Sequence, residues 1–137
     1  MARIEKTDRE WRDELTPEQY AVLRRAGTEP AFAGKYDGVK TPGIYRCAGC
    51  KTPLFRSSHK YDSGSGWPSF WEPIDPAAVL ERSDESHGMV RTEVLCAACE
   101  GHLGHVFPDG PPPTGRRYCM NSAALELDES VEPDADV

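Results

Sequence analysis

The sequence predicts a mainly β domain of antiparallel strands, with short helices at its N-terminus. A chain of 137 residues is long enough for one hydrophobic core. Its 12 prolines and 12 glycines favour turns over long helices. Short apolar or alternating runs, separated by turn sequences, continue over most of the chain. We therefore expect a single domain over residues 1–127.

The N-terminal helices are expected at about residues 8–26. Trp11 and Leu15 lie four positions apart and so share one face of a helix. The segment Thr16-Pro17-Glu18-Gln19 combines an N-cap threonine, a proline at the first helical position and a capping-box glutamine. Gly27 is placed to end the second helix. We expect both helices to pack against a sheet.

The predicted strands begin after Pro30, where the runs become short and are separated by glycine and proline. Turn sequences lie between them, notably at 63–66 and 109–113. The strands are expected at residues 43–46, 53–55, 69–71, 89–94, 102–107, 117–121 and 123–127.

Charge and hydropathy exclude several classes of partner. A net charge of -7 disfavours nucleic acid and anionic membranes. Residues 128–137 hold five acids and no base, which predicts a disordered acidic tail. No apolar run approaches the ~20 residues of a membrane span, and the N-terminus has no signal-peptide core. We expect a monomer in the reducing cytoplasm.

Four of the five cysteines form two C-x-x-C pairs, Cys47/Cys50 and Cys96/Cys99. A two-residue gap lets a tight turn direct both sulfurs at one tetrahedral ion, so the pairs predict one structural Zn²⁺. A redox dithiol, an iron–sulfur cluster and two disulfides are the alternatives. A redox pair usually opens a helix after a strand, and neither pair precedes a helical pattern.

The fifth cysteine, Cys119, is the candidate nucleophile. A free cysteine is most often a small buried hydrophobic residue, so its context decides. On a strand, Arg117 and Asn121 share a face with Cys119, and a guanidinium and an amide there would favour the thiolate.

The pair His102 and His105 offers a proton donor for reduction of an S=O or C=O group. Structural histidines and zinc ligands are the alternative interpretations. Trp67, between Gly66 and Pro68, could form an apolar wall for a methyl or thioether group, whereas Trp71 is expected in the core. We include Phe107 as a second substrate-binding residue.

The sequence closely resembles the B-type peptide-methionine sulfoxide reductases, which act on the R epimer at sulfur. The resemblance covers about residues 11–127. It is carried by Cys47/Cys50, Gly64-Ser65-Gly66-Trp67-Pro68-Ser69-Phe70, Arg91-Thr92-Glu93-Val94, Cys96/Cys99, His102-Leu103-Gly104-His105-Val106-Phe107, Asp109-Gly110-Pro111 and Arg117-Tyr118-Cys119-Met120-Asn121-Ser122.

The resemblance implies two antiparallel sheets, a structural zinc distant from the active site, and repair of oxidised proteins with thioredoxin as the usual electron donor. It implies that Cys119 attacks the sulfoxide sulfur and that His102 and His105 bind and protonate the departing oxygen. Trp67 would hold the ε-methyl group, with Arg117 and Asn121 supporting the thiolate or the oxygen. Cys119 would be left as a sulfenic acid.

The sequence departs from the family at Ser65, where many relatives have the cysteine that resolves the sulfenic acid. A hydroxyl cannot form a disulfide, so either an external thiol attacks Cys119 or a zinc cysteine is sacrificed. We favour thioredoxin, glutaredoxin or a small thiol. A binding module without chemistry, a nucleic-acid-binding zinc ribbon and a cysteine hydrolase are the rival classes. The binding module would have no reason to place His102, His105, Arg117 and Cys119 together.

Overall fold

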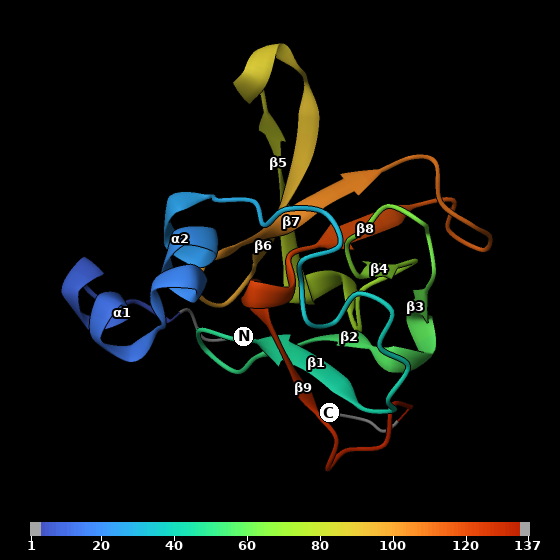
Figure 1. The fold of residues 1–137 in the computed structure, drawn as a ribbon, viewed down its shortest axis with the longest axis horizontal. Helices are drawn as coiled ribbons and strands as arrows, with labels where there is room; N and C mark the ends of the chain where they lie inside the picture. Colours follow the sequence, from blue (N-terminus) through green and yellow to red (C-terminus); the bar gives the residue numbers. More distant parts are fainter. Residues whose placement is uncertain (1–3, 135–137) are drawn as a thin grey trace.

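The computed structural model describes residues 4–134, apart from the side chain of His87, and its strands form two antiparallel sheets beside a pair of helices (Figure 1). The smaller sheet has the strand order β2-β1-β9, and the larger has the order β3-β4-β8-β7-β6-β5. The strands are β1 Ile44–Cys47, β2 Pro53–Arg56, β3 Lys60–Tyr61, β4 Ser69–Phe70, β5 Val79–Asp84, β6 Arg91–Cys96, β7 His102–Phe107, β8 Arg117–Met120 and β9 Leu125–Asp128. Short 3-10 turns are η1 Ser57–His59, η2 Pro76–Ala78, η3 Ser86–Gly88 and η4 Ser122–Ala124.

The helices α1 Asp8–Glu14 and α2 Pro17–Arg25 lie on one side of the molecule (Figure 1). Each begins with a complete capping box, formed by Thr7 with Glu10 and by Thr16 with Gln19. Helix α2 packs against β7 and η4 and buries Val22 and Leu23. Neither helix, nor any other within residues 4–134, has the length and apolar character needed to cross a membrane.

An aromatic cluster joins the two sheets. Phe55 of β2 stacks on Phe70 of β4 with ring centroids 4.4 Å apart, and Tyr45 of β1 meets Phe70 edge-on at 5.2 Å. Tyr118 of β8 lies 5.9 Å from Phe55. All four side chains are buried, and large aromatic groups contribute most of the apolar area of a small core. The cluster therefore fixes β4 and β8 from one face and leaves their other face for a site.

The predicted fold class is confirmed, and the missed strands are explained by their composition. Strand β5 buries only Val79 at its first position and is otherwise polar, because it lies at the edge of the larger sheet. Strand β3 has two residues, too few for a periodic pattern. Together with β6, β5 forms a hairpin that projects from the body (Figure 1).

Two further expectations differ from the structure. Trp71 is half-buried and packs against His59 with ring centroids 4.1 Å apart, whereas Trp11 is the tryptophan that enters the core. Asp128, expected in the disordered tail, is the last residue of β9 and pairs with Arg46 at 2.8 Å. Beyond it, the Pro133 carbonyl accepts a hydrogen bond from Arg56. Residues 135–137 lie outside the described chain.

Candidate active site

The two C-x-x-C pairs form matching turns, and their sulfurs converge. In each turn the residue after the second cysteine has a positive φ, 67° at Lys51 and 59° at Glu100. Its backbone N–H donates to the carbonyl of the first cysteine at 2.8 Å in both turns. The four sulfurs, those of Cys47, Cys50, Cys96 and Cys99, lie within 4.8 Å of one another and form the cysteine cluster.

The cysteine cluster fits a tetrahedral ion. The Cys47–Cys99 and Cys50–Cys96 sulfur separations are 3.7 and 3.6 Å. Zinc–sulfur bonds of about 2.3 Å place sulfurs about 3.8 Å apart in a tetrahedron, whereas a disulfide requires about 2.05 Å. Since Cys47 ends β1 and Cys96 ends β6, an ion held here would tie the two sheets together.

Cys119 lies on the interior strand β8, between β4 and β7. It is opposite Ser69 of β4 and His105 of β7 in the strand register. Residues directly opposite in an antiparallel sheet point to the same face, so these three side chains are neighbours. The next pairs, Phe70 with Tyr118 and Tyr118 with Val106, point to the buried core. The alternation of β8 therefore separates the reactive face from the packed face.

A cavity of about 300 Å³ opens on the reactive face. It gathers side chains from β6, β7, β8 and two loops. Six predicted site residues line it together with the Ser65 position, namely Trp67, His105, Phe107, Arg117, Cys119 and Asn121. Arg91, Thr28 and Gly104 complete the lining, and none of the cysteine-cluster residues takes part. The predicted residues, apart from His102, thus meet around one space.

Gly104 is required where β7 and β8 approach most closely. A Cβ at this position would stand 2.1 Å from the Cys119 carbonyl oxygen and 2.9 Å from Met120 Cα. Both neighbours are backbone atoms of β8 and could not move aside without displacing Cys119. The glycine between the two histidines therefore maintains the spacing of the site.

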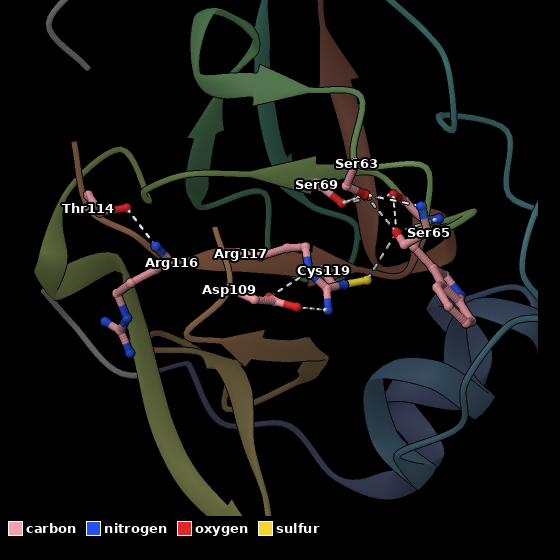
Figure 2. A network of polar contacts seen from close by, with 9 residues as sticks. Ser63, Ser65, Ser69, Asp109, Thr114, Arg116, Arg117 and Cys119 are labelled. Atoms are coloured by element: carbon pink, nitrogen blue, oxygen red, sulfur yellow. Dashed lines mark hydrogen bonds and ion pairs between the residues drawn. The ribbon is translucent and has the colours of Figure 1, made fainter. Parts of the chain in front are cut away.

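The environment of the Cys119 sulfur contains opposing influences. Burial raises the pKa of the thiol, and hydrogen bonds from Ser65 and Ser69 with the charge of Arg117 act in the opposite direction. Ser65 Oγ lies 3.8 Å from the sulfur (Figure 2). The expected effect of Arg117 is present, but burial outweighs it. The thiol of the free protein is therefore not the strongly ionised group that the sequence suggested.

Arg117 is held in place by Asp109. Its Nε and Nη2 atoms donate to the two carboxylate oxygens at 2.9 and 3.2 Å (Figure 2). The ion pair lowers the pKa of Asp109, mainly through this hydrogen bond. The guanidinium also lies over the Phe107 ring, 4.4 Å from its centroid. Two contacts thus fix one cation beside the cavity.

A bulge in β7 brings the two histidines together. Strand partners step from Gly104 to His102 across Val94 and Leu95, which leaves one extra residue in β7. The rings of His102 and His105 consequently lie edge-on with centroids 5.4 Å apart. In a regular strand, residues three apart would point to opposite faces.

His105 is the histidine that lines the cavity, and Asp84 of β5 binds it. The distance from His105 Nε2 to Asp84 Oδ2 is 2.8 Å, and the same carboxylate oxygen accepts from Arg91 at 3.2 Å. Hydrogen bonds, first from Ser86 and then from His105, lower the Asp84 pKa. A carboxylate bound to one ring nitrogen orients the imidazole and leaves the other nitrogen available to a ligand.

His102 lies behind His105 and is 4% exposed. Burial, reinforced by the nearby His105, lowers its pKa to about 4 from the ordinary value of 6.5. His102 is therefore neutral at neutral pH. This position separates it from the cavity lining, although the sequence predicted equal parts for both histidines.

Acidification is expected to destabilise the fold through His102. Its folded pKa lies below its unfolded pKa, so the unfolded chain binds the proton first, and stability present above pH 6.5 is lost as the pH falls towards 4. The loss amounts to about 2.5 kcal/mol at about pH 4.5. Urea unfolding at both pH values should show a fall that is smaller by this amount in His102→Gln. Equal falls in the two proteins would contradict the prediction.

Trp67 and Asn121 are linked through Glu29, a residue without a sequence signal. The indole N–H of Trp67 donates to the Glu29 carbonyl at 2.9 Å, and the Glu29 N–H donates to Asn121 Oδ1 at 3.0 Å. Asn121 Nδ2 donates in turn to the Leu103 carbonyl at 3.0 Å. Asn121 thus holds the loop of Glu29 and strand β7 in place, in addition to lining the cavity.

Several residues of the site were not predicted from the sequence. Asp84 and Glu29 lie in polar or irregular segments that carry no periodic signal. Asp109 and Arg91 belong to motifs that carried the family resemblance, and a search for partners of Arg117 and His105 could have singled out acids near them. Ser63 and Ser69 flank the glycine-rich turn and looked like ordinary turn residues.

A thiol, an imidazole bound to a carboxylate, and apolar walls around one cavity define a cysteine-dependent enzyme. The model of the SelR domain family matches residues 15–129. The "Peptide methionine sulfoxide reductase MsrB" of Pseudomonas fluorescens is 62% identical over 127 residues, covering 93% of this chain and 98% of the relative. That of Thiobacillus denitrificans is 64% identical over 122 residues, covering 89% and 92%. The chain belongs to the SelR domain family, the B-type methionine sulfoxide reductases, and is an oxidoreductase.

Proposed function

We propose that this chain reduces peptide-bound methionine (R)-sulfoxide to methionine, with Cys119 as the nucleophile and a sulfenic acid as its product. The observation that carries the proposal is the position of the Cys119 sulfur in a cavity with Trp67 and Phe107 on its lining and His105 directly opposite. Apolar walls suit the methyl and thioether carbons, and the polar side suits the sulfoxide oxygen. The R preference is taken from the family.

The chemistry balances within the cavity. Cys119 attacks the sulfoxide sulfur as the oxygen gains a proton, because protonation makes that sulfur electrophilic. The Cys119 sulfur then takes up the oxygen, and methionine leaves with its sulfur reduced by two electrons. The thiol hydrogen and the sulfoxide oxygen together account for the sulfenic acid. His105 is the proton donor we favour, with His102 supporting its ring.

Regeneration requires an external thiol, which we propose to be thioredoxin or another reductant of the same chemistry. A first thiol condenses with the sulfenic acid, releasing water and forming a mixed disulfide, and a second thiol restores Cys119. Ser65 Oγ is 3.8 Å from the Cys119 sulfur, so a cysteine at this position would be close to the nucleophile. The serine therefore leaves the resolving step without an internal partner there.

The cysteine cluster is proposed to hold one Zn²⁺ with a structural role. Four thiolates satisfy a tetrahedral ion fully and leave no position for substrate. The matching turns and the sulfur separations of 3.6 and 3.7 Å support this assignment. With all four sulfurs bound, these cysteines would not be free to resolve Cys119.

A single turnover tests the proposal. Reduced protein is mixed with a peptide carrying racemic methionine sulfoxide, without reductant, and both partners are followed by mass spectrometry. We expect about one methionine per chain, consumption of the R epimer alone, and one added oxygen or a dimedone adduct on Cys119. Intact, metal-loaded protein that forms no methionine would favour a binding module instead. An intramolecular disulfide to a cluster cysteine would exclude the external route.

A further inference from the structure

Three serine hydroxyls connect the Cys119 sulfur to a backbone carbonyl. From the sulfur, the chain runs to Ser65 Oγ at 3.8 Å, to Ser63 Oγ at 2.8 Å and to Ser69 Oγ at 2.7 Å. It ends at the Trp67 carbonyl, to which Ser69 Oγ donates at 3.1 Å. Figure 2 shows the three hydroxyls gathered beside the sulfur. We call this group the serine chain.

The hydrogens of the serine chain can be assigned by counting. Four contacts need four hydrogens, and each hydroxyl and the thiol supply one. A carbonyl only accepts, so Ser69 must donate to Trp67 and Ser63 must then donate to Ser69. Ser65 donates to Ser63, and the Cys119 thiol donates to Ser65. With Cys119 as a thiol, only one direction of the chain satisfies all four contacts.

Loss of the thiol proton makes this direction impossible, because the sulfur can then only accept. Ser65 can turn its hydrogen to the thiolate if Ser63 turns to Ser65 and Ser69 turns to Ser63. The Trp67 carbonyl then gives up its bond from Ser69. One neutral hydrogen bond is exchanged for one to a charged sulfur, and charge-assisted bonds are the stronger kind.

We propose that the serine chain reverses direction when Cys119 ionises, so that Ser65 is a catalytic residue that stabilises the thiolate and Ser63 and Ser69 are positioning residues. The inference rests on the proposed function in one respect, the identity of Cys119 as the reacting thiol. It gives the serine at the usual resolving position a role of its own. Cooperative polarisation along the chain strengthens the bond to sulfur.

Other groups also face the sulfur and set the background for this effect. They are Arg117 on the same strand with its partner Asp109, His105 on β7 with its partner Asp84, Arg91 on β6 and the Tyr61 phenol on β3. The serine chain differs from them because its donors reorient without moving a charge. Its contribution is therefore separable by removing single hydroxyls.

The test measures ionisation of Cys119 directly. The rate of iodoacetamide alkylation is followed across a pH series on full-length, metal-loaded protein, and the Cys119 peptide is quantified by mass spectrometry. In Ser65→Ala we expect the rate at neutral pH to fall by about tenfold, with an unchanged limiting rate at alkaline pH. In Ser63→Ala, where Ser65 keeps its hydroxyl but loses its donor, we expect a fall of about two- to threefold.

Matched variants separate this role from a structural one. Ser65→Thr retains a hydroxyl and should restore the rate of the unchanged protein. Ser58→Ala removes an exposed hydroxyl that binds Asp134 and should not alter the titration. A Ser65→Ala profile identical to the unchanged protein would overturn the proposal. An unaltered Ser63→Ala profile would overturn the chain, since Ser65 would then act alone.

The alkylation assay contains no sulfoxide, so its outcome is independent of the proposed reaction. Shifted profiles in a protein that fails to reduce sulfoxide would support the serine chain and reject the proposed function. Normal turnover with unshifted profiles would do the reverse. Melting curves and metal content of each variant exclude loss of the fold as the cause.

Discussion

Replacement of Cys119 by serine is expected to abolish methionine formation while leaving the fold intact. An alcohol is scarcely ionised at neutral pH, and serine oxygen cannot take up oxygen from a sulfoxide as sulfur does. The rate should fall by at least about a thousandfold, the scale on which loss of a nucleophile acts. The substituted atom is half-buried and of similar size, so stability should change by less than about 1 kcal/mol.

The measurement combines single-turnover methionine formation with thermal unfolding and metal analysis. Full activity in Cys119→Ser would show that another group performs the reaction. Loss of both activity and fold would assign Cys119 to the core, where free cysteines are commonly found. The position of the sulfur in the cavity leads us to expect loss of activity alone.

Strand patterns predicted most of the fold because burial alternates along them. Strand β8 illustrates this, since Tyr118 and Met120 are buried in the core and Arg117 and Cys119 line the cavity. The capping box at Thr16 was equally clear. Strand β5 lacked a signal because an edge strand that projects from the body buries little. Its contribution is Asp84, which reaches His105 only through strand pairing.

The site was predicted as a set of residue types, but the relations among them depend on tertiary structure. The spacing of His102 and His105 could not reveal the bulge that brings them together, or that only His105 reaches the cavity. Burial of Cys119, which raises its pKa, likewise depends on loops distant in sequence. Glu29 acts through its backbone and its buried carboxylate, so no motif could identify it.

The two faces of β8 explain how the site remains rigid. The aromatic cluster packs one face, and Asp109, Asp84 and Glu29 each hold one group on the other through hydrogen bonds. Rigid support of this kind keeps reacting groups in a productive arrangement. The cysteine cluster then bears on the site indirectly, because it joins the strands β1 and β6 that carry the two sheets.

Removal of the metal is expected to unfold the protein. A four-thiolate zinc site contributes roughly 10–16 kcal/mol, about as much as the whole stability of a small domain. Cys47 and Cys96 are fully buried and end strands of different sheets, so metal-free thiolates would repel one another between the sheets. Chelation under mild heating should therefore abolish the cooperative thermal transition, and activity should fall with it.

Cys47→Ser and Cys119→Ser provide a matched pair, since each removes one thiol from the same chain. We expect Cys47→Ser to lose its metal and its melting transition, and Cys119→Ser to retain one zinc per chain and melt like the unchanged protein. Metal content and circular dichroism measured on the same samples make the comparison. A metal-free Cys47→Ser protein with an unchanged transition would mean that the aromatic cluster alone holds the sheets. The expected contrast would instead assign stability to four cysteines and chemistry to the fifth.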